Sequence, residues 1–167
     1  GNLCYEAIFS ELFERFEIKA NSRVETLKEN PFDYFAHPTD LNLPLELNSG
    51  NPSVCQDYLE TLELSSATNE WSREIMKAAE FRTLEVLTRL TETFHETFEV
   101  QDRFEAGVFS PEKTFAEKKG SCRDLSVLMI HILRSLNLPS RFVSGYYEAD
   151  PANKEKDLHA WVEVYIK

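Results

Sequence analysis

The spacing of hydrophobic residues predicts a series of helices in the middle of the chain. From 81 to 98, apolar residues recur three and four positions apart, which is the period of a helix that buries one face. The residues of this predicted face are Leu84, Val86, Leu87, Leu90, Phe94 and Phe98. A preceding helix is predicted over 69–79, with Asn69 as its N-cap. A serine–proline pair predicts the start of a short helix over 110–119.

The next predicted helix is hydrophobic around nearly its whole circumference. It runs from Ser121 to about Asn137 and is followed by Pro139, so we expect it to be buried in the core. After it the pattern changes. Residues 141–147 are rich in β-branched and aromatic types, and in 158–166 apolar residues take every second position, which predicts two strands. Helices followed by strands predict an α+β domain in which a long buried helix packs on an antiparallel sheet.

The first part of the chain has a different pattern. Apolar and charged residues alternate around 16–20, which predicts a strand or hairpin. Four prolines within 30–52 predict a long loop with at most one turn of helix. We interpret residues 1–28 as a β-strand or hairpin edge, the remnant of an upstream β domain, and residues 29–167 as the main domain.

Composition and charge narrow the possible functions. A chain of 167 residues that is 42% hydrophobic suits one compact core. A net charge of −11 without a basic stripe argues against nucleic acid or an anionic membrane surface as the partner. No apolar run is long enough to cross a bilayer. Three widely spaced cysteines without a C-x-x-C pair favour a reducing, cytoplasmic setting.

The segment Gly120-Ser121-Cys122-Arg123-Asp124 contains the strongest candidate for chemistry. Ser121 and Asp124 have the spacing of a capping box, which places Cys122 in the first turn of the buried helix. Unpaired N–H groups and the positive end of the helix dipole stabilise a thiolate there, and Arg123 adds positive charge. The same N–H groups can hold an oxyanion. By its position alone, Cys122 is equally well interpreted as a small buried hydrophobic residue.

A thiol nucleophile needs an imidazole within hydrogen-bond reach to exchange protons. His131 lies nine residues after Cys122 on the same predicted helix, about 13 Å along its axis, which is too far. We interpret His95 and His37 as ordinary surface or loop residues. His159 lies on a predicted strand, opposite the apolar face, so the strand fixes it while its ring points away from the core.

Alternatives to this pair have less support. Cys55 can also begin a helix and Cys4 has no supporting context, so both are interpreted as structural. The nearest match to a zinc-binding helix, His95-Glu96-Thr97-Phe98-Glu99, has Glu where the second His is required. The sequence therefore predicts no metal site.

The motifs around the two candidate residues occur in a recognisable order. They are Gly120-Ser121-Cys122-Arg123-Asp124, Arg141-Phe142-Val143-Ser144-Gly145-Tyr146 and His159-Ala160-Trp161-Val162-Glu163-Val164. With Ser110-Pro111 before them, they closely resemble the core of transglutaminase-like cysteine enzymes, especially the bacterial branch described as cysteine proteases. The resemblance is close over 110–167 and looser over 14–97.

This resemblance implies a papain-like α+β fold, the transglutaminase core of the cysteine proteinase type. It implies that Cys122 is the nucleophile, that His159 is its base, and that no metal or organic cofactor takes part. The implied reaction passes through an acyl-enzyme thioester formed from a peptide or protein carboxamide. We therefore expect a cysteine peptidase or amidohydrolase. The alternatives are a protein-glutamine acyltransferase and a non-catalytic interaction domain with the same fold.

The resemblance also implies a third catalytic residue, an Asp on the strand after the His strand. We expect this acid beyond Lys167, so that the catalytic core is truncated at its C-terminus. Asp157 is a poor substitute because it lies beside His159 on one strand. The residues expected to support or line the site are Ser121, Asp124, Arg123, Tyr146 and Trp161.

Overall fold

The computed structural model describes residues 6–12, 14–19, 21, 23, 25, 27, 30, 41–45, 52–146 and 158–166. The chain divides into two units, Gly1–Tyr34 and Phe35–Lys167. Within the described residues of the first unit, no helix or strand is assigned. The strand or hairpin of residues 1–28 therefore stays a prediction, and the elements that follow all belong to the second unit.

The first long helix, α2 (Ser66–Ala78), begins earlier than its hydrophobic pattern indicates. Its N-cap is Ser65, whose side chain accepts a hydrogen bond from the Thr68 N–H at 3.2 Å. The prediction that Asn69 caps this helix is therefore wrong. Asn69 lies inside the first turn, and its side-chain amide donates to the carbonyl oxygen of Leu64 at 3.0 Å. An asparagine can satisfy its amide in this way without ending a helix.

The next helix, α3 (Thr83–Thr97), confirms the predicted period. Val86, Leu90 and Phe94 are spaced four apart and are buried, which fixes the face that the helix turns to the core. The prediction that Leu84 shares this face is wrong, because its side chain is 39% exposed. Leu84 lies two positions before Val86, which turns it about 200° around the helix.

A short parallel strand pair, which the sequence analysis does not predict, follows α3. The strands are β1 (Glu99–Val100) and β2 (Lys119–Gly120), with Val100 opposite Gly120. The backbone N–H of Gln101 donates to the carbonyl oxygen of Gly120 at 3.0 Å and extends the pairing. This pair sets the end of α3 beside the residues that lead into the cysteine-bearing helix.

Two helices begin where their capping residues predict. Ser110 caps α4 (Pro111–Glu117), with the proline in its first turn. Ser121 caps α5 (Cys122–Ser135), and both hydrogen bonds of the capping box with Asp124 are present. Every residue of α5 except the last is at least partly buried, which confirms the prediction of a core helix.

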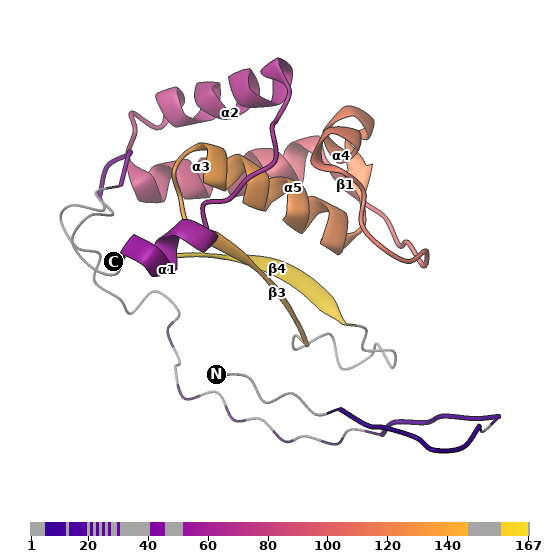
Figure 1. The fold of residues 1–167 in the computed structure, drawn as a ribbon. Helices are drawn as coiled ribbons and strands as arrows, with labels where there is room; N and C mark the ends of the chain where they lie inside the picture. Colours follow the sequence, from indigo (N-terminus) through magenta and orange to yellow (C-terminus); the bar gives the residue numbers. More distant parts are fainter. Residues whose placement is uncertain are drawn as a thin grey trace. The chain divides into compact units, whose positions relative to one another are not determined.

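An antiparallel sheet ends the fold, as predicted. It consists of β3 (Ser140–Gly145) and β4 (His159–Val164), with Gly145 opposite His159. Helix α5 packs against both strands, and Figure 1 shows α2, α3 and α5 on one side of the sheet. The domain thus has the predicted α+β architecture, a buried helix on an antiparallel sheet.

The core lies between these helices and the sheet. Its buried members are Leu43, Leu45, Leu64, Ala79, Val86, Leu90, Phe94, Phe98, Leu128, Ile132, Leu133, Leu136 and Leu138. The first two come from the segment predicted as a loop, which a bridge between Asn42 and Arg82 attaches to the start of α3. Helix α1 (Pro52–Asp57) begins at the end of the same segment.

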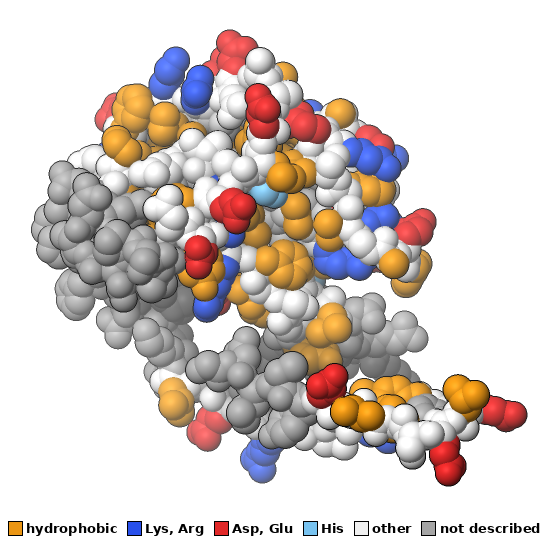
Figure 2. All heavy atoms as spheres, viewed as in Figure 1, with side chains coloured by type: hydrophobic (Ala, Val, Ile, Leu, Met, Phe, Trp, Pro, Cys, Tyr) orange, Lys and Arg blue, Asp and Glu red, His pale blue; other side chains and the backbone are white. Residues whose placement is uncertain are grey.

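The surface of the second unit has a mixed charge. On the face shown in Figure 2, acidic and basic side chains are interspersed with hydrophobic ones, and this face has no basic stripe. None of the helices in the described part of the chain combines the length and hydropathy needed to span a membrane.

Candidate active site

A hollow of about 430 Å³ in the second unit is lined by both Cys122 and His159. Helix α5 supplies Cys122 as its first residue, and strand β4 supplies His159 as its first residue. The other lining residues are Leu87, Leu90, Thr91, Phe94, Val100, Leu125, Ser126, Met129, Leu133, Ala160, Val162 and Val164. The two residues that the sequence motifs single out therefore border the same space.

Cys122 is half-buried at the N-terminus of α5. The side chain of the cap residue Ser121 accepts a hydrogen bond from the N–H of Asp124. The N–H groups of Cys122 and Arg123 lie in the first turn and have no acceptors within the helix. Such groups lie next to the thiol and can donate to an oxygen that becomes negatively charged there. The local structure is therefore suited to acyl transfer at this sulfur.

His159 is half-buried and lines the hollow together with Ala160 and Val162. That its ring points away from the core stays a prediction. His159 is the first residue of β4 and pairs with Gly145, the last residue of β3, so it lies at the end of the sheet. At this end of the strand, His159 borders the space in front of α5.

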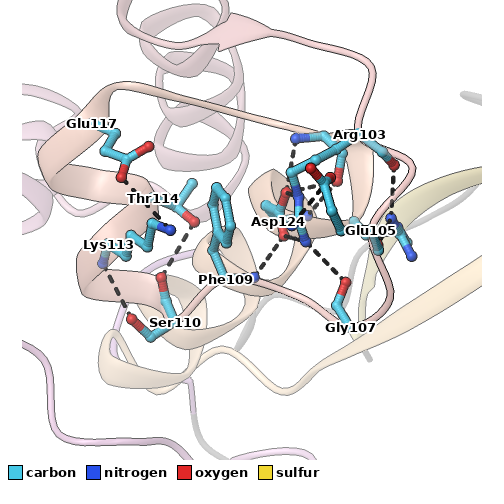
Figure 3. A network of polar contacts seen from close by, with 11 residues as sticks. Arg103, Glu105, Gly107, Phe109, Ser110, Lys113, Thr114, Glu117 and Asp124 are labelled. Atoms are coloured by element: carbon cyan, nitrogen blue, oxygen red, sulfur yellow. Dashed lines mark hydrogen bonds and ion pairs between the residues drawn. The ribbon is translucent and has the colours of Figure 1, made fainter.

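The carboxylate of Asp124 organises the start of α5 (Figure 3). Asp124 is fully buried and accepts hydrogen bonds from the N–H and the hydroxyl of Ser121 at 2.9 and 2.7 Å. It also accepts from Nε of Arg103 at 3.0 Å and from the N–H of Phe109 at 2.7 Å. Burial alone would raise the pKa of Asp124, but these hydrogen bonds outweigh it and the pKa is lowered. The carboxylate is therefore ionised at neutral pH.

Two arginines hold the segment between β1 and α4 against this carboxylate. Arg103 donates to the carbonyl oxygen of Gly107 at 3.0 Å, and its guanidinium lies 3.9 Å from the centroid of the Phe109 ring. Arg123 donates to the carbonyl oxygens of Arg103 and Glu105 at 3.0 and 3.2 Å. The guanidinium of Arg123 thus binds this segment, whereas the sequence analysis assigns it a charge effect on the thiol.

Gly120 leaves room for this arrangement. A Cβ atom at Gly120 would lie 2.9 Å from Cβ of Asp124 and 3.5 Å from Cγ2 of Thr114. The first distance is shorter than real Cβ contacts, so only glycine fits before the cap of α5 without displacing its neighbours. The glycine of the cysteine motif therefore has a packing reason, and it keeps the buried carboxylate close to the cap.

None of the three residues expected to line the site, Arg123, Tyr146 and Trp161, is among the described lining residues of the hollow. Arg123 binds the segment between β1 and α4 instead. Tyr146 is exposed, and the ring of Trp161 lies over Gly145, where an added Cβ would meet Cη2 at 2.9 Å. Asp157 lies outside the described residues, as do Cys4 and His37.

The remaining candidates contribute to other parts of the fold. Nδ1 of His131 accepts a hydrogen bond from the N–H of Leu62 at 3.0 Å, which ties α5 to the segment before α2. Cys55 lines a different hollow together with Tyr58 and Arg141. In the described residues, no group of three or more His, Cys, Asp or Glu side chains is placed to hold a metal ion.

Sequence reasoning misses Arg103 and Val100. The signal for Arg103 is indirect: an Asp in the first turn of a buried helix needs a positively charged partner. The chain has 18 lysines and arginines, and no sequence spacing distinguishes the one that pairs with Asp124. Val100 belongs to a strand of two residues. Such a strand is too short to leave a pattern of alternation.

Comparisons with known proteins identify the family and the fold. The family model of the transglutaminase-like superfamily matches residues 69–167. A structure from Cytophaga hutchinsonii, described as a "putative cysteine protease", is similar with a TM-score of 0.58 and 20% identity, over 76% of this chain and 42% of that chain. The periplasmic domain of TgpA from Pseudomonas aeruginosa is similar with a TM-score of 0.53 and 24% identity, over 70% of this chain and 44% of that chain.

These likenesses show the fold, which is the papain-like fold predicted from the sequence. The chain spans less than half the length of each of these two structures. No curated protein sequence matches the chain.

Proposed function

The chain belongs to the transglutaminase-like superfamily, and we propose that it is a thiol-dependent enzyme that cleaves amide bonds. In this proposal Cys122 is the nucleophile, His159 is the base, and the substrate is a peptide or protein carboxamide. The observation that carries the proposal is that both residues line one hollow, each at the first residue of its element. A cysteine peptidase or amidohydrolase needs a thiol and an imidazole at one site, so this placement supports the proposal.

The proposed reaction has two stages. First, His159 takes the proton of the Cys122 thiol, and Sγ attacks the carbonyl carbon. The carbon–nitrogen bond breaks, the amine leaves with the proton from His159, and a thioester remains. Second, His159 takes a proton from water, the resulting hydroxide attacks the thioester, and the carbon–sulfur bond breaks to release the acid and the thiol.

The mounting of the nucleophile supports this proposal. The Asp124 carboxylate accepts a hydrogen bond from the N–H of Ser121 at the start of α5. It also accepts hydrogen bonds from Arg103 and from the N–H of Phe109. A reactive group placed on a rigid helix with fixed neighbours keeps its geometry through the reaction. The third catalytic acid that the family resemblance implies stays a prediction.

Alkylation by iodoacetamide tests the proposal. We expect Cys122 to be labelled about tenfold faster than Cys55 and Cys4 near neutral pH, as measured by mass spectrometry of peptides. His159→Ala should slow the labelling of Cys122, while His95→Ala, on the outer part of α3, should leave it unchanged. Labelling of Cys122 no faster than of Cys4 and Cys55 would contradict the enzyme and favour a non-catalytic domain.

A transglutaminase would use the same thioester and differ only in its acceptor, an amine in place of water. Hydrolysis is favoured because the similar structure from Cytophaga hutchinsonii is described as a "putative cysteine protease". The two reactions are distinguished by incubating a glutamine-containing peptide with and without a primary amine. Hydrolysis yields the free acid in both cases, and an amine adduct would indicate transamidation.

A further inference from the structure

The hollow beside Cys122 has an unusually uniform lining. Apart from Cys122, His159, Thr91 and Ser126, its described lining residues are hydrophobic, and none of them is charged. Its volume of about 430 Å³ is in the range of about 300–1,000 Å³ typical of small-molecule sites. The space is therefore large enough for a side chain of a substrate.

This lining discriminates between charged and apolar substrate groups by the free energy of removing them from water. A charged group that enters an apolar space without a partner loses its hydration and is strongly disfavoured, whereas an aliphatic group gains by leaving water. The floor is rigid because Leu90 and Leu133 are almost fully buried members of the core. The hollow is therefore suited to an uncharged, apolar group next to the thiol.

Val100 lies at the rim of this hollow. It lines the hollow although its side chain is 67% exposed, so it can be replaced without disturbing the core. The pairing of β1 with β2 places Val100 opposite Gly120, two residues before Cys122. The backbone bond from Gln101 to Gly120 at 3.0 Å fixes this position.

We propose that the hollow is the pocket for an uncharged, apolar side chain of a polypeptide acyl donor, and that Val100 is a specificity-determining residue at its rim. The inference rests on the proposed function, because it requires the reactive carbonyl of the donor to lie at Cys122. It goes beyond that function by naming the substrate class and the side chain that selects it.

Two matched thiol-directed probes test this assignment in the full chain. Both are peptidyl acyloxymethyl ketones, one with Leu and one with Asp beside the ketone, whose shapes are similar and whose charges differ. Sγ of Cys122 attacks the methylene carbon of the probe, and the carboxylate leaves. We expect the Leu probe to label Cys122 at least about tenfold faster than the Asp probe, as measured by mass spectrometry.

The rim residue is tested by a change of charge. Val100→Lys should lower the Leu-to-Asp preference by at least about threefold, because the ammonium offers the Asp probe a partner. The matched control is Val108→Lys, at an exposed valine of the segment before α4 that does not line the hollow. This control should keep the preference of the unmodified chain.

The outcomes separate the inference from the function on which it rests. Rapid labelling by iodoacetamide together with equal labelling by both probes, or with labelling by neither, would overturn the pocket and leave the thiol enzyme intact. A preference that Val100→Lys and Val108→Lys change equally would overturn the role of Val100. Slow labelling of Cys122 by iodoacetamide would overturn the proposed function and the inference together.

Discussion

The guanidinium of Arg103 binds the buried carboxylate of Asp124, with Nε 3.0 Å from Oδ2. The side chain of Asp124 is fully buried and that of Arg103 is only 10% exposed, so both charges are largely removed from water. The pair joins the start of α5, which bears Cys122, to the segment between β1 and α4. Such a pair keeps two chain segments in register because either charge alone would be left without compensation.

Replacing this carboxylate should weaken the fold. Asp124→Asn keeps the shape of the side chain but removes the buried counter-charge of Arg103, whose own side chain is largely buried. It also weakens the hydrogen bond accepted from the N–H of Phe109. We expect the free energy of unfolding to fall by about 3 kcal/mol, as measured by urea denaturation. The labelling rate of Cys122 should fall as well, because the first turn of α5 loses part of its support.

The matched control for Asp124→Asn is Glu105→Gln. Glu105 also approaches Arg103, at 3.7 Å from Nη1, but its side chain is 75% exposed. Its replacement should change the free energy of unfolding by no more than about 0.5 kcal/mol. If the two variants proved equally stable, the ion pair of Asp124 would not be what holds this segment.

Two glycines should differ in their tolerance of a methyl group. At Gly120 the added Cβ would meet Cβ of Asp124, which its hydrogen bonds hold in place, so Gly120→Ala should destabilise the fold by about 2–3 kcal/mol. At Gly145 it would meet the far end of the Trp161 ring, which can swing away into solvent. Gly145→Ala should therefore cost about 1 kcal/mol or less, as measured by thermal unfolding. Equal losses would contradict a rigid contact at Gly120.

The elements with a strong local signal could be predicted from the sequence. The caps at Ser110 and Ser121, the all-round hydrophobicity of α5 and the alternation of β4 each follow a local rule, and each is confirmed. The predicted cap of α2 is wrong because Asn69 and Ser65 both suit an N-cap, and the hydrogen bond that Glu112 accepts from the N–H of Ser65 is a tertiary contact. Local rules therefore fix the kind of element better than its first residue.

The two candidate residues of the site could be named from the sequence, whereas most of the residues around them could not. Cys122 and His159 stand in motifs with a fixed order, so they could be named without a structure. The partners of Asp124 could not, because Arg103 and Phe109 reach it through the tertiary fold from a segment with no periodic pattern. The same holds for Val100, whose place at the hollow depends on pairing with Gly120. Long-range contacts of this kind leave no characteristic spacing of residues in the sequence.

Acid should destabilise the fold through Glu112. Its Oε1 accepts hydrogen bonds from the N–H of Ser65 at 2.9 Å and from the hydroxyl of Thr68 at 3.1 Å. Burial alone would raise its pKa, but these bonds outweigh it and the pKa lies below its ordinary value of 4.5. The unfolded chain therefore takes up the proton first as the pH falls. The stabilisation is complete above pH 4.5 and is lost as the pH falls through the lower pKa of the folded state.

Glu112→Gln tests this dependence because it removes the titration and keeps the shape. The urea midpoint of the variant should fall less steeply than that of the unmodified chain between about pH 5 and pH 3. Asp124, whose pKa is also lowered, accounts for part of the slope that remains. The control Glu117→Gln, at an exposed residue of α4, should leave the slope unchanged. If the urea midpoint of Glu112→Gln fell with pH as steeply as that of the unmodified chain, the hydrogen bonds of Glu112 would contribute nothing to the pH dependence of stability.

A second loss of stability should begin at a higher pH, through His131. Burial and, less strongly, the positive charge of Arg134 lower the pKa of His131 from its ordinary value of 6.5. Its Nδ1 accepts the N–H of Leu62, and protonation would remove this acceptor. Because the unfolded chain binds the proton more readily, the stabilisation is complete above pH 6.5 and is lost as the pH falls through the lower pKa of the folded state.

His131→Gln should abolish this second loss, because glutamine does not titrate. Urea midpoints measured from about pH 7.5 to pH 5 should fall for the unmodified chain and stay nearly level for the variant. His95→Gln, at an exposed histidine of α3, should retain the fall. Iodoacetamide labelling of Cys122 should be the same in both variants, because His131 binds the segment before α2 and not the thiol. A fall that persists in His131→Gln would place the titrating group elsewhere in the fold.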